Sequence, residues 1–297
     1  MIDNYDKWKQ AGRIAAEALE HGRSLIKKGN KVLDVCEAAD NKIIELGAKP
    51  AWPTQVSINE AAAHFTPDQD DNLVFGDDLV SMDVGVHIDG FVGDNATSVD
   101  LSGKYSNIIN ASKEALDAAI KTVQPGVSVS EIGKAVQEVI TSHGLNPVKN
   151  LTGHGISQWI IHDRPSIPSY ENNDKTKLEV NKIIAIEPFA TNGIGLIMET
   201  ETSNIFSLVN KKPVRSPYAR EIIKYIEENY YNLVFTTRWL EKVFGKGKTN
   251  LAIKELLRLN IIHSHPPLIE RSKGVVSVFE KTMLVKERGD EILTKID

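Results

Sequence analysis

Two glutamates of this 297-residue chain stand where a carboxylate is costly to bury. Glu187 ends the apolar run of residues 183–186 and precedes Pro188, while Glu280 lies inside the strand-like run around residues 275–279. A buried carboxylate without a partner costs several kcal/mol, so each must be protonated, paired or bound to a cation. Taken singly, either glutamate could equally be a solvated residue at the end of a strand.

Two aspartates and a histidine extend this set. His154 lies between Gly153 and Gly155, which permit a tight backbone around a projecting imidazole, although a lone histidine there is more often a turn residue. With Asp83 and Asp94 the set comprises four carboxylates and one imidazole. Such donors suit Mn, Fe, Co or Zn, and the lack of thiolates argues against a soft-metal site. The single cysteine, Cys36, falls on the apolar side of an expected helix and is interpreted as a packing residue.

The segment that carries both aspartates predicts a β-hairpin. Residues 79–99 are rich in β-branched side chains, and Asp89 and Gly90 stand in the middle. An Asp-Gly pair flanked by such runs is a strong signal for a two-residue hairpin turn. If these two residues form the turn, Ile88 faces Phe91 across the strands.

Counted outward from that turn, Asp83 faces Ala96, and Asp94 projects from the same face as Asp83. The two carboxylates then become diagonal cross-strand neighbours, with Cα atoms about 7–8 Å apart. That separation lets both reach a pair of metal ions about 3.5–4 Å apart. Without the hairpin, both could be outward-facing polar residues of an alternating strand. His87 shares the predicted face but lies about 13 Å along the strand from Asp83, so we expect it at the surface.

Helical periodicity occurs twice in the chain with the same plan. The spacing of apolar residues predicts helices over residues 8–28, 32–46, 108–123 and 129–143. Positions coincide at an offset of 97 residues for Gly29 and Gly126, Val32 and Val129, Asp34 and Glu131, Gly47 and Gly144, and Pro50 and Pro147. In each copy an acidic residue favours a helix start. The repeat predicts two related halves of one pseudo-symmetric α/β domain.

An insert of different charge follows the second half. Residues 207–271 contain 12 Lys and Arg against 6 Asp and Glu, a net charge of +6, whereas the remainder carries 23 against 34, or −11. Three expected helices, 220–230, 237–244 and 248–260, predict a small helical or winged-helix-like unit. Such a basic insert is usually just a solvated face. Residues 1–206 and 272–297 are assigned to the main domain, in which residues 274–285 alternate like a strand.

The bulk composition describes an ordinary globular protein. Hydrophobic residues make up 41% and charged residues 25% of the chain, and the net charge is −5, too mild to indicate nucleic acid or membrane as the main partner. No apolar stretch approaches the roughly 18 residues of a membrane span, and the first ten residues do not resemble a signal peptide. We therefore expect a cytoplasmic protein without membrane contact, and a monomer.

Several short motifs occur in a family-specific order. They are Trp52-Pro53-Thr54, the run Ser57-Ile58-Asn59-Glu60-Ala61-Ala62-Ala63-His64-Phe65-Thr66-Pro67, Met82-Asp83-Val84-Gly85-Val86-His87-Ile88-Asp89-Gly90 with Asp94, Asn150-Leu151-Thr152-Gly153-His154, Ile161-His162, Ala185-Ile186-Glu187-Pro188-Phe189-Ala190-Thr191 and Phe279-Glu280. As a set they resemble the type II methionine aminopeptidases over essentially the whole chain, insert included. The chain is similar to the short archaeal form, without a long charged N-terminal extension.

The resemblance implies the pita-bread fold and a dinuclear metal centre. It implies two divalent ions (Co, Mn, Fe or Zn) on Asp83, Asp94, His154, Glu187 and Glu280, with a bridging hydroxide that attacks the first peptide bond. Glu187 would also shuttle the proton. His64 and His162 would contact the substrate and stabilise the oxyanion. The implied substrates are nascent proteins, from which the initiator methionine is removed.

Two residues depart from the family pattern. Trp52 stands where the family usually has phenylalanine, and His265 at a position that is commonly tyrosine in eukaryotic members. Both are expected to line the methionine pocket, where a thioether still packs well on aromatic rings.

Two rival functions remain open at this point. One is cleavage of Xaa-Pro bonds by an enzyme of the same fold, which the presence of His64, His162 and the basic insert disfavours. The other is a binding protein with a degraded metal site, which would require the loss of at least one of the five ligands. A further hypothesis is that the basic insert docks the protein on ribosomal RNA, since phosphate attraction needs clustered basic residues.

Overall fold

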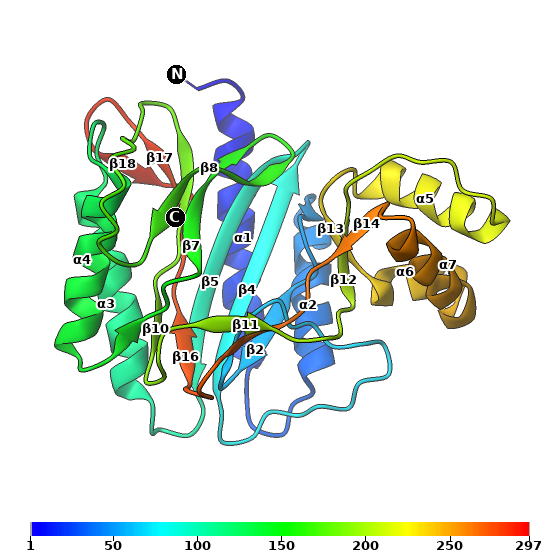
Figure 1. Ribbon diagram of the computed structural model, residues 1–297, viewed down its shortest axis with the longest axis horizontal. Coiled ribbons are helices and arrows are strands. Elements are labelled where there is room, and N and C mark those ends of the chain that lie inside the picture. The colour runs from blue at the N-terminus through cyan, green and yellow to red at the C-terminus, as the bar shows by residue number, and fades with distance from the viewer. Residues whose placement is uncertain (1, 297) are drawn as a thin grey trace.

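The computed structural model describes residues 2–296 and places a long β-hairpin at its centre, with helices on both flanks (Figure 1). The helices are α1 (Tyr5–Leu25), α2 (Val32–Glu45), α3 (Ser106–Thr122), α4 (Val129–Ser142), α5 (Pro217–Asn229), α6 (Thr237–Phe244) and α7 (Lys246–Arg258). Every helix predicted from the sequence is present, with ends shifted by no more than three residues. Among the described residues, no helix is both long and apolar enough to cross a membrane.

The strands form several small sheets rather than one continuous sheet. They are β1 (Lys49–Pro50), β2 (Gln55–Ile58), β3 (Ala61–Ala63), β4 (Leu79–Ile88), β5 (Phe91–Asp100), β6 (Asn146–Pro147), β7 (Thr152–Ser157), β8 (Ile160–Pro168), β9 (Ile183–Ile186), β10 (Phe189–Thr191), β11 (Ile197–Glu199), β12 (Ile205–Leu208), β13 (Val234–Thr236), β14 (Ile262–Ser264), β15 (Leu268–Glu270), β16 (Val276–Val278), β17 (Lys281–Val285) and β18 (Asp290–Ile292). The hairpin β4–β5 also pairs with β1 and β2, and β9 joins β7 to β17.

The hairpin lies unusually close to helix α1. A Cβ atom added to Gly93 of β5 would lie only 2.7 Å from the Gly12 backbone of α1, so position 93 needs glycine for this approach. A Cβ atom at Gly12 would instead lie 2.5 Å from the Leu293 carbonyl oxygen. The apolar side of α1 packs on β4 through Ile14, Ala15, Ala18 and Leu19. The helix therefore fixes the strands that carry the two aspartates.

The predicted repeat is confirmed by equivalent backbone contacts in the two halves. Gly29 and Gly126 both have left-handed φ angles, 84° and 85°. The Gly29 N–H donates to the Phe75 carbonyl at 2.8 Å, and the Gly126 N–H donates to the Leu178 carbonyl at 2.9 Å. The halves differ in how the next helix begins. In α4 Ser128 and Glu131 form a capping box, whereas α2 has no side-chain cap.

The expected strand over residues 274–285 is wrong in one respect. The structure divides it into β16 and β17, which belong to different sheets, with Phe279 and Glu280 between them. The reason is a change of partner, since β16 pairs with β10 and β17 pairs with β9. Glu280 therefore lies at a break between strands rather than inside one.

The basic insert has a core of its own at one end of the molecule (Figure 1). Strands β12, β13 and β14 form a three-stranded sheet, and α5, α6 and α7 pack on it through a separate apolar cluster that includes Ile222, Ile226, Phe235 and Leu256. Strand β15, which follows, pairs instead with β3 and β11. The sheet of the insert thus spans residues 205–264.

Candidate metal centre

The hairpin places Asp83 and Asp94 as its sequence predicts. Strand β4 pairs with β5 so that Ile88 faces Phe91, Asp83 faces Ala96, and Asp94 faces Gly85. Both aspartates line a cavity with a volume of about 500 Å³. The predicted register is therefore confirmed, and it turns both carboxylates toward one cavity.

Glu187 and Glu280 lie opposite each other at two aligned strand breaks. Ile186 pairs with Lys281 on one side of the breaks, and Phe189 pairs with Val278 on the other. Glu187 therefore follows Ile186 and Glu280 precedes Lys281, at the point where the strand pairing passes from one sheet to another. Because regular pleating stops there, both side chains can project into the same cavity.

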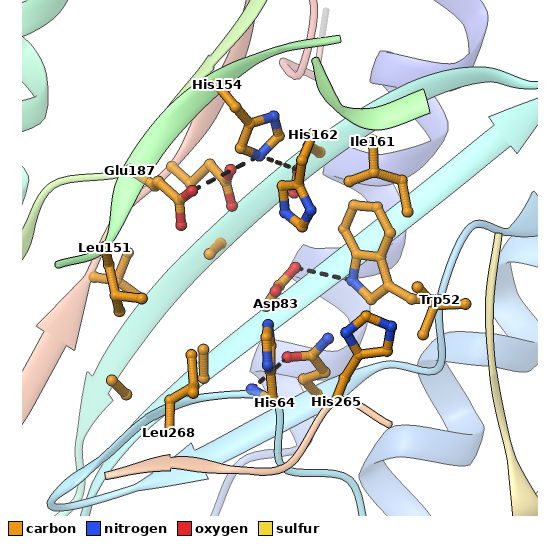
Figure 2. Close-up of a pocket in the computed structure, with 18 of the residues that line it drawn as sticks. Trp52, His64, Asp83, Leu151, His154, Ile161, His162, Glu187, His265 and Leu268 are labelled. Atoms are coloured by element: carbon orange, nitrogen blue, oxygen red, sulfur yellow. Dashed lines mark hydrogen bonds and ion pairs between the residues drawn. The ribbon is translucent and has the colours of Figure 1, made fainter. Parts of the chain in front are cut away.

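His154 completes a compact group of donors. Asp94, His154 and Glu280 each offer one ligand atom, and these atoms all lie within 4.8 Å of one another. The Nε2 of His154 lies 3.6 Å from the Asp94 carboxylate and 3.7 Å from that of Glu187 (Figure 2). Its Nδ1 lies 3.1 Å from the Gly155 carbonyl oxygen, which can only accept. Nδ1 therefore carries the proton, and the Nε2 lone pair faces the carboxylates.

The electrostatics of the cluster favour a bound cation. Burial, followed by the charges of the other carboxylates, raises the pKa of Asp94, Glu187 and Glu280 well above their usual range. Burial also raises the pKa of Asp83 to about 7 and lowers that of His154 to about 3. Within residues 2–296, no lysine or arginine forms an ion pair with these four carboxylates.

The donor set fits divalent metal. One carboxylate oxygen of Asp94 is buried without a hydrogen-bond partner among the described residues. Four mutually repelling carboxylates and one neutral imidazole are oxygen and nitrogen donors of the kind that divalent transition ions prefer. All five residues proposed from the sequence are thus brought together, and a divalent cation would supply the positive charge that they lack.

Two further histidines face this cluster from different elements. His162 on β8 lies edge-on to His154, with ring centroids 4.5 Å apart. His64 follows β3 with a left-handed φ of 63°, an uncommon backbone conformation for a non-glycine residue. Its N–H donates to Gln55 at 2.7 Å, which helps to hold that conformation. The Nδ1 of His64 is buried and has no partner among the described residues.

Both of these imidazoles are neutral near pH 7. Burial, together with the charges of His265 and His162, lowers the pKa of His64 to about 4. Burial also lowers the pKa of His162. Each ring therefore offers one N–H donor and one acceptor to a molecule in the cavity.

Trp52 contacts the metal-ligand cluster directly. Its indole Nε1 donates to an Asp83 oxygen at 3.2 Å (Figure 2). Room for the indole comes from Gly85, where an added Cβ would lie 2.3 Å from the Trp52 ring. The sequence predicted a pocket-lining role for Trp52 and gave no sign of this hydrogen bond.

The wall beside Trp52 and His64 mixes polar and apolar side chains. His265 lies edge-on to His64, with ring centroids 6.0 Å apart, and its Nε2 lies 2.8 Å from the Ser207 hydroxyl oxygen. Apolar lining comes from Leu151, Ile161, Phe189, Ile205, Val234 and Leu268. Trp159 and Asn232 also line the cavity, and no periodicity or motif in the sequence had singled them out.

The surface position expected for His87 is wrong. His87 is buried, its Nδ1 accepts a 3.2 Å hydrogen bond from the Gly90 N–H, and its ring lies 5.2 Å from that of Trp159. Distance along the strand correctly separated His87 from Asp83. It could not reveal that Trp159, from the β7–β8 turn, covers the tip of the hairpin.

Comparisons with known proteins agree with this geometry. The family model for metallopeptidase family M24 matches residues 6–215. A methionine aminopeptidase of Archaeoglobus fulgidus is 46% identical over 291 residues, 98% of each chain. Another, from Methanocaldococcus jannaschii, is 41% identical over 295 residues, 99% of each chain. This chain belongs to the methionine aminopeptidases of metallopeptidase family M24.

The fold is the pita-bread fold of that family. The crystal structure of a methionine aminopeptidase from Thermotoga maritima matches with a TM-score of 0.72, covering 98% of this chain and 96% of that one at 24% identity. The segment matched by the family model contains Asp83, Asp94, His154 and Glu187 but ends before Glu280. The structure brings Glu280 back to the other four through β16 and β17.

Proposed function

We propose that this protein is a metal-dependent aminopeptidase that removes the N-terminal initiator methionine from nascent proteins. The observation that carries the proposal is the cluster of four carboxylates and one neutral imidazole that line a partly apolar cavity, with Asp94, His154 and Glu280 buried. Membership of the methionine aminopeptidases supports the same substrate. The insert and the similarity to methionine aminopeptidases of archaea support the archaeal type II form.

Asp83, Asp94, His154, Glu187 and Glu280 would hold two divalent ions. Such ions supply Lewis acidity toward the scissile carbonyl and toward an attacking water. Glu187 faces the cavity beside His154. Its carboxylate would accept a proton from the water and pass it to the departing amine, as a general base that then acts as a general acid.

His64 and His162 would act on the substrate carbonyl. Both rings line the cavity and are neutral, so each can present an N–H to the developing oxyanion without adding a net charge. A donor placed there contributes about 10²–10³ in rate in other acyl-transfer enzymes. The unpartnered Nδ1 of His64 supports a role in which a ligand completes its hydrogen bonding.

Trp52, His265 and the apolar lining residues would receive the methionine side chain. Thioethers pack favourably on aromatic rings, and Trp52 offers such a surface next to Asp83. The cavity thus supports recognition of a flexible apolar residue immediately beside the reacting bond.

One experiment tests the proposed methionine aminopeptidase activity against both rival functions. Metal-stripped protein is assayed on Met-Ala-Ser and on an Xaa-Pro peptide, with Co, Mn, Fe or Zn added back separately. Cleavage of Met-Ala-Ser by at least one reconstituted form is expected. Preferential cleavage of Xaa-Pro would replace the proposed substrate, and failure to take up any metal would support a binding protein.

We also propose that residues 207–271 form a winged-helix-like subdomain that docks near ribosomal RNA. Its net charge of +6, against −11 for the remainder, supports attraction to phosphate. Lys211 is 80% exposed, although it pairs with Glu227 at 3.1 Å, and Lys246 pairs with Asp70 at 2.8 Å. Neutralising Lys211, Lys212 and Lys246 should weaken co-sedimentation with ribosomes. Unchanged binding would contradict this part of the proposal.

A further inference from the structure

Arg238 is a fully buried charge at the junction between the insert and the main domain. It belongs to α6 and has no exposed surface. One terminal nitrogen donates to the Thr66 hydroxyl at 3.1 Å and to the Pro67 carbonyl at 2.8 Å. The other donates to the Asp40 carboxylate at 3.2 Å. A buried guanidinium requires such partners, so these hydrogen bonds hold α6 in this one position.

Asp40 links that guanidinium to a second loop. It lies on α2 and accepts hydrogen bonds from the Thr54 N–H at 3.0 Å and from the Thr54 hydroxyl at 2.7 Å. The Trp239 indole donates to it at 3.3 Å. The Thr66 hydroxyl in turn donates to the Thr54 carbonyl at 2.9 Å. Arg238, Asp40, Thr54 and Thr66 therefore form one closed, buried network, here called the clamp.

Each loop in the clamp carries a cavity residue two positions earlier in the chain. Thr54 follows Trp52, and Thr66 follows His64. The insert holds the first loop at one more point, because the Val234 N–H donates to the Ala51 carbonyl at 3.2 Å. Just before the insert, the Asn204 amide donates to the Thr66 carbonyl at 2.8 Å.

The backbone conformation of His64 in particular needs support from other segments of the chain. Its left-handed φ of 63° is sparsely populated for histidine and persists only when the surroundings hold it. The Gln55 hydrogen bond holds its amide, and the clamp holds the chain immediately after it. Glu37 of α2 also lies 3.7 Å from the Arg238 Nε, and it pairs with the exposed Lys242 on the same helix as Arg238.

We propose that Arg238 and Asp40 are positioning residues through which the insert sets the placement of Trp52 and His64 in the cavity. The proposal rests on the roles assigned above to those two side chains. The insert thereby helps to position residues of the active site, in addition to any docking role.

The test separates positioning from stability by removing the two charges together. Arg238→Met alone leaves the Asp40 carboxylate buried without its ionic partner and should lower the melting temperature strongly. Adding Asp40→Asn removes that charge and should recover most of the loss. The double variant still lacks the bonds to Thr66 and Pro67. Because small misplacements of active-site groups are costly, we expect its kcat/KM on Met-Ala-Ser to fall about tenfold or more.

Histidine NMR supplies a readout that a purely structural role would not move. In ¹⁵N-histidine-labelled protein, the ring signals of His64 should shift in the double variant, while those of His162, held by β8, stay in place. At saturating metal, the number of ions bound per chain should remain that of the wild type. Lys224→Met is the control, since it removes an exposed ion pair with Glu228 on another helix of the insert and should change neither kcat/KM nor the His64 signals.

A double variant with wild-type kcat/KM and unchanged His64 signals would overturn the proposal. If the double variant does not fold, Arg238→Lys takes its place, because an ammonium keeps the charge but cannot reproduce the planar fork. Reduced kcat/KM and shifted His64 signals are expected there too, and wild-type values would again overturn the proposal. Full activity in His64→Ala would disprove the catalytic role of His64. It would not disprove the clamp, because the NMR comparison tests the clamp independently.

Discussion

The indole Nε1 of Trp52 donates a 3.2 Å hydrogen bond to the carboxylate of Asp83. One side chain of the cavity wall is thereby joined to one proposed ligand of the metal centre. A phenylalanine at this position could not make this bond because its ring has no donor. The proposed substrate pocket and the proposed metal centre are therefore in direct contact in this chain.

Replacing Trp52 with phenylalanine should weaken metal binding. Trp52→Phe keeps an aromatic wall but removes the donor that orients Asp83, and loss of such outer contacts typically costs 10–100-fold in metal affinity. We expect at least about tenfold weaker binding of the second metal ion, measured by competition with a chelating dye. Trp159→Phe is the control, because Trp159 lines the same cavity without touching a carboxylate. Equal affinities in all three proteins would contradict the prediction.

A methyl group at position 85 should displace the Trp52 ring. In Gly85→Ala the new Cβ would lie 2.3 Å from the indole, closer than side-chain carbons approach one another. We expect kcat/KM to fall about tenfold or more, with a changed tryptophan emission spectrum. Gly247→Ala serves as the control, since an added Cβ there meets nothing within 4 Å. Wild-type kcat/KM in Gly85→Ala would show that the position of the Trp52 indole does not affect catalysis.

The proposed proton shuttle can be removed without changing shape. Glu187→Gln keeps the size of the side chain but cannot exchange a proton at the required step, so turnover on Met-Ala-Ser should be nearly abolished. His64→Ala should reduce turnover by about 10²-fold, as expected for loss of one oxyanion donor. Steady-state kinetics at saturating metal measure both. A Glu187→Gln enzyme with an undiminished rate would assign the shuttle to another group.

Removing the metal should destabilise the protein more at high pH than at low pH. In the metal-free fold the pKa of Asp83 is raised to about 7, and those of Asp94, Glu187 and Glu280 are raised further above their usual range. The folded chain therefore binds these protons more tightly than the unfolded chain does. Their contribution to stability is present at low pH and is lost as pH rises through 7.

Thermal unfolding with and without a chelator measures this effect. Bound metal stabilises the folded state by mass action, so the melting temperature should fall on chelation at every pH. The fall should be larger at pH 8 than at pH 6. A drop that is independent of pH would mean that the pKa values of these four carboxylates are not raised in the metal-free protein.

The hairpin was predictable because its signals are local. A two-residue turn at Asp89 and Gly90 fixes the strand register, and the register fixes the face of every side chain, including those of Asp83 and Asp94. Helical periodicity likewise gave the helices to within three residues. These features depend on neighbours in the chain, which the sequence displays directly.

The contacts that complete the cavity depend on segments far apart in the chain. Glu280 appeared to continue a strand, because its neighbours are apolar and β-branched, and only the partners of β16 and β17 reveal the break. Arg238 was counted among the charges of a basic insert, yet its side chain is completely buried against residues 40 and 66. A charge count records composition and cannot tell a solvated arginine from a buried one.

The repeated halves share the donors of the cluster between them. Asp83 and Asp94 come from the first half, and His154, Glu187 and Glu280 from the second. Neither half by itself contains the whole ligand set. A chain consisting of a single half could complete such a centre only by associating with a second copy about a twofold axis. The fused repeat permits what an exact dimer could not: one half supplies an imidazole as well as carboxylates, while the other supplies carboxylates alone.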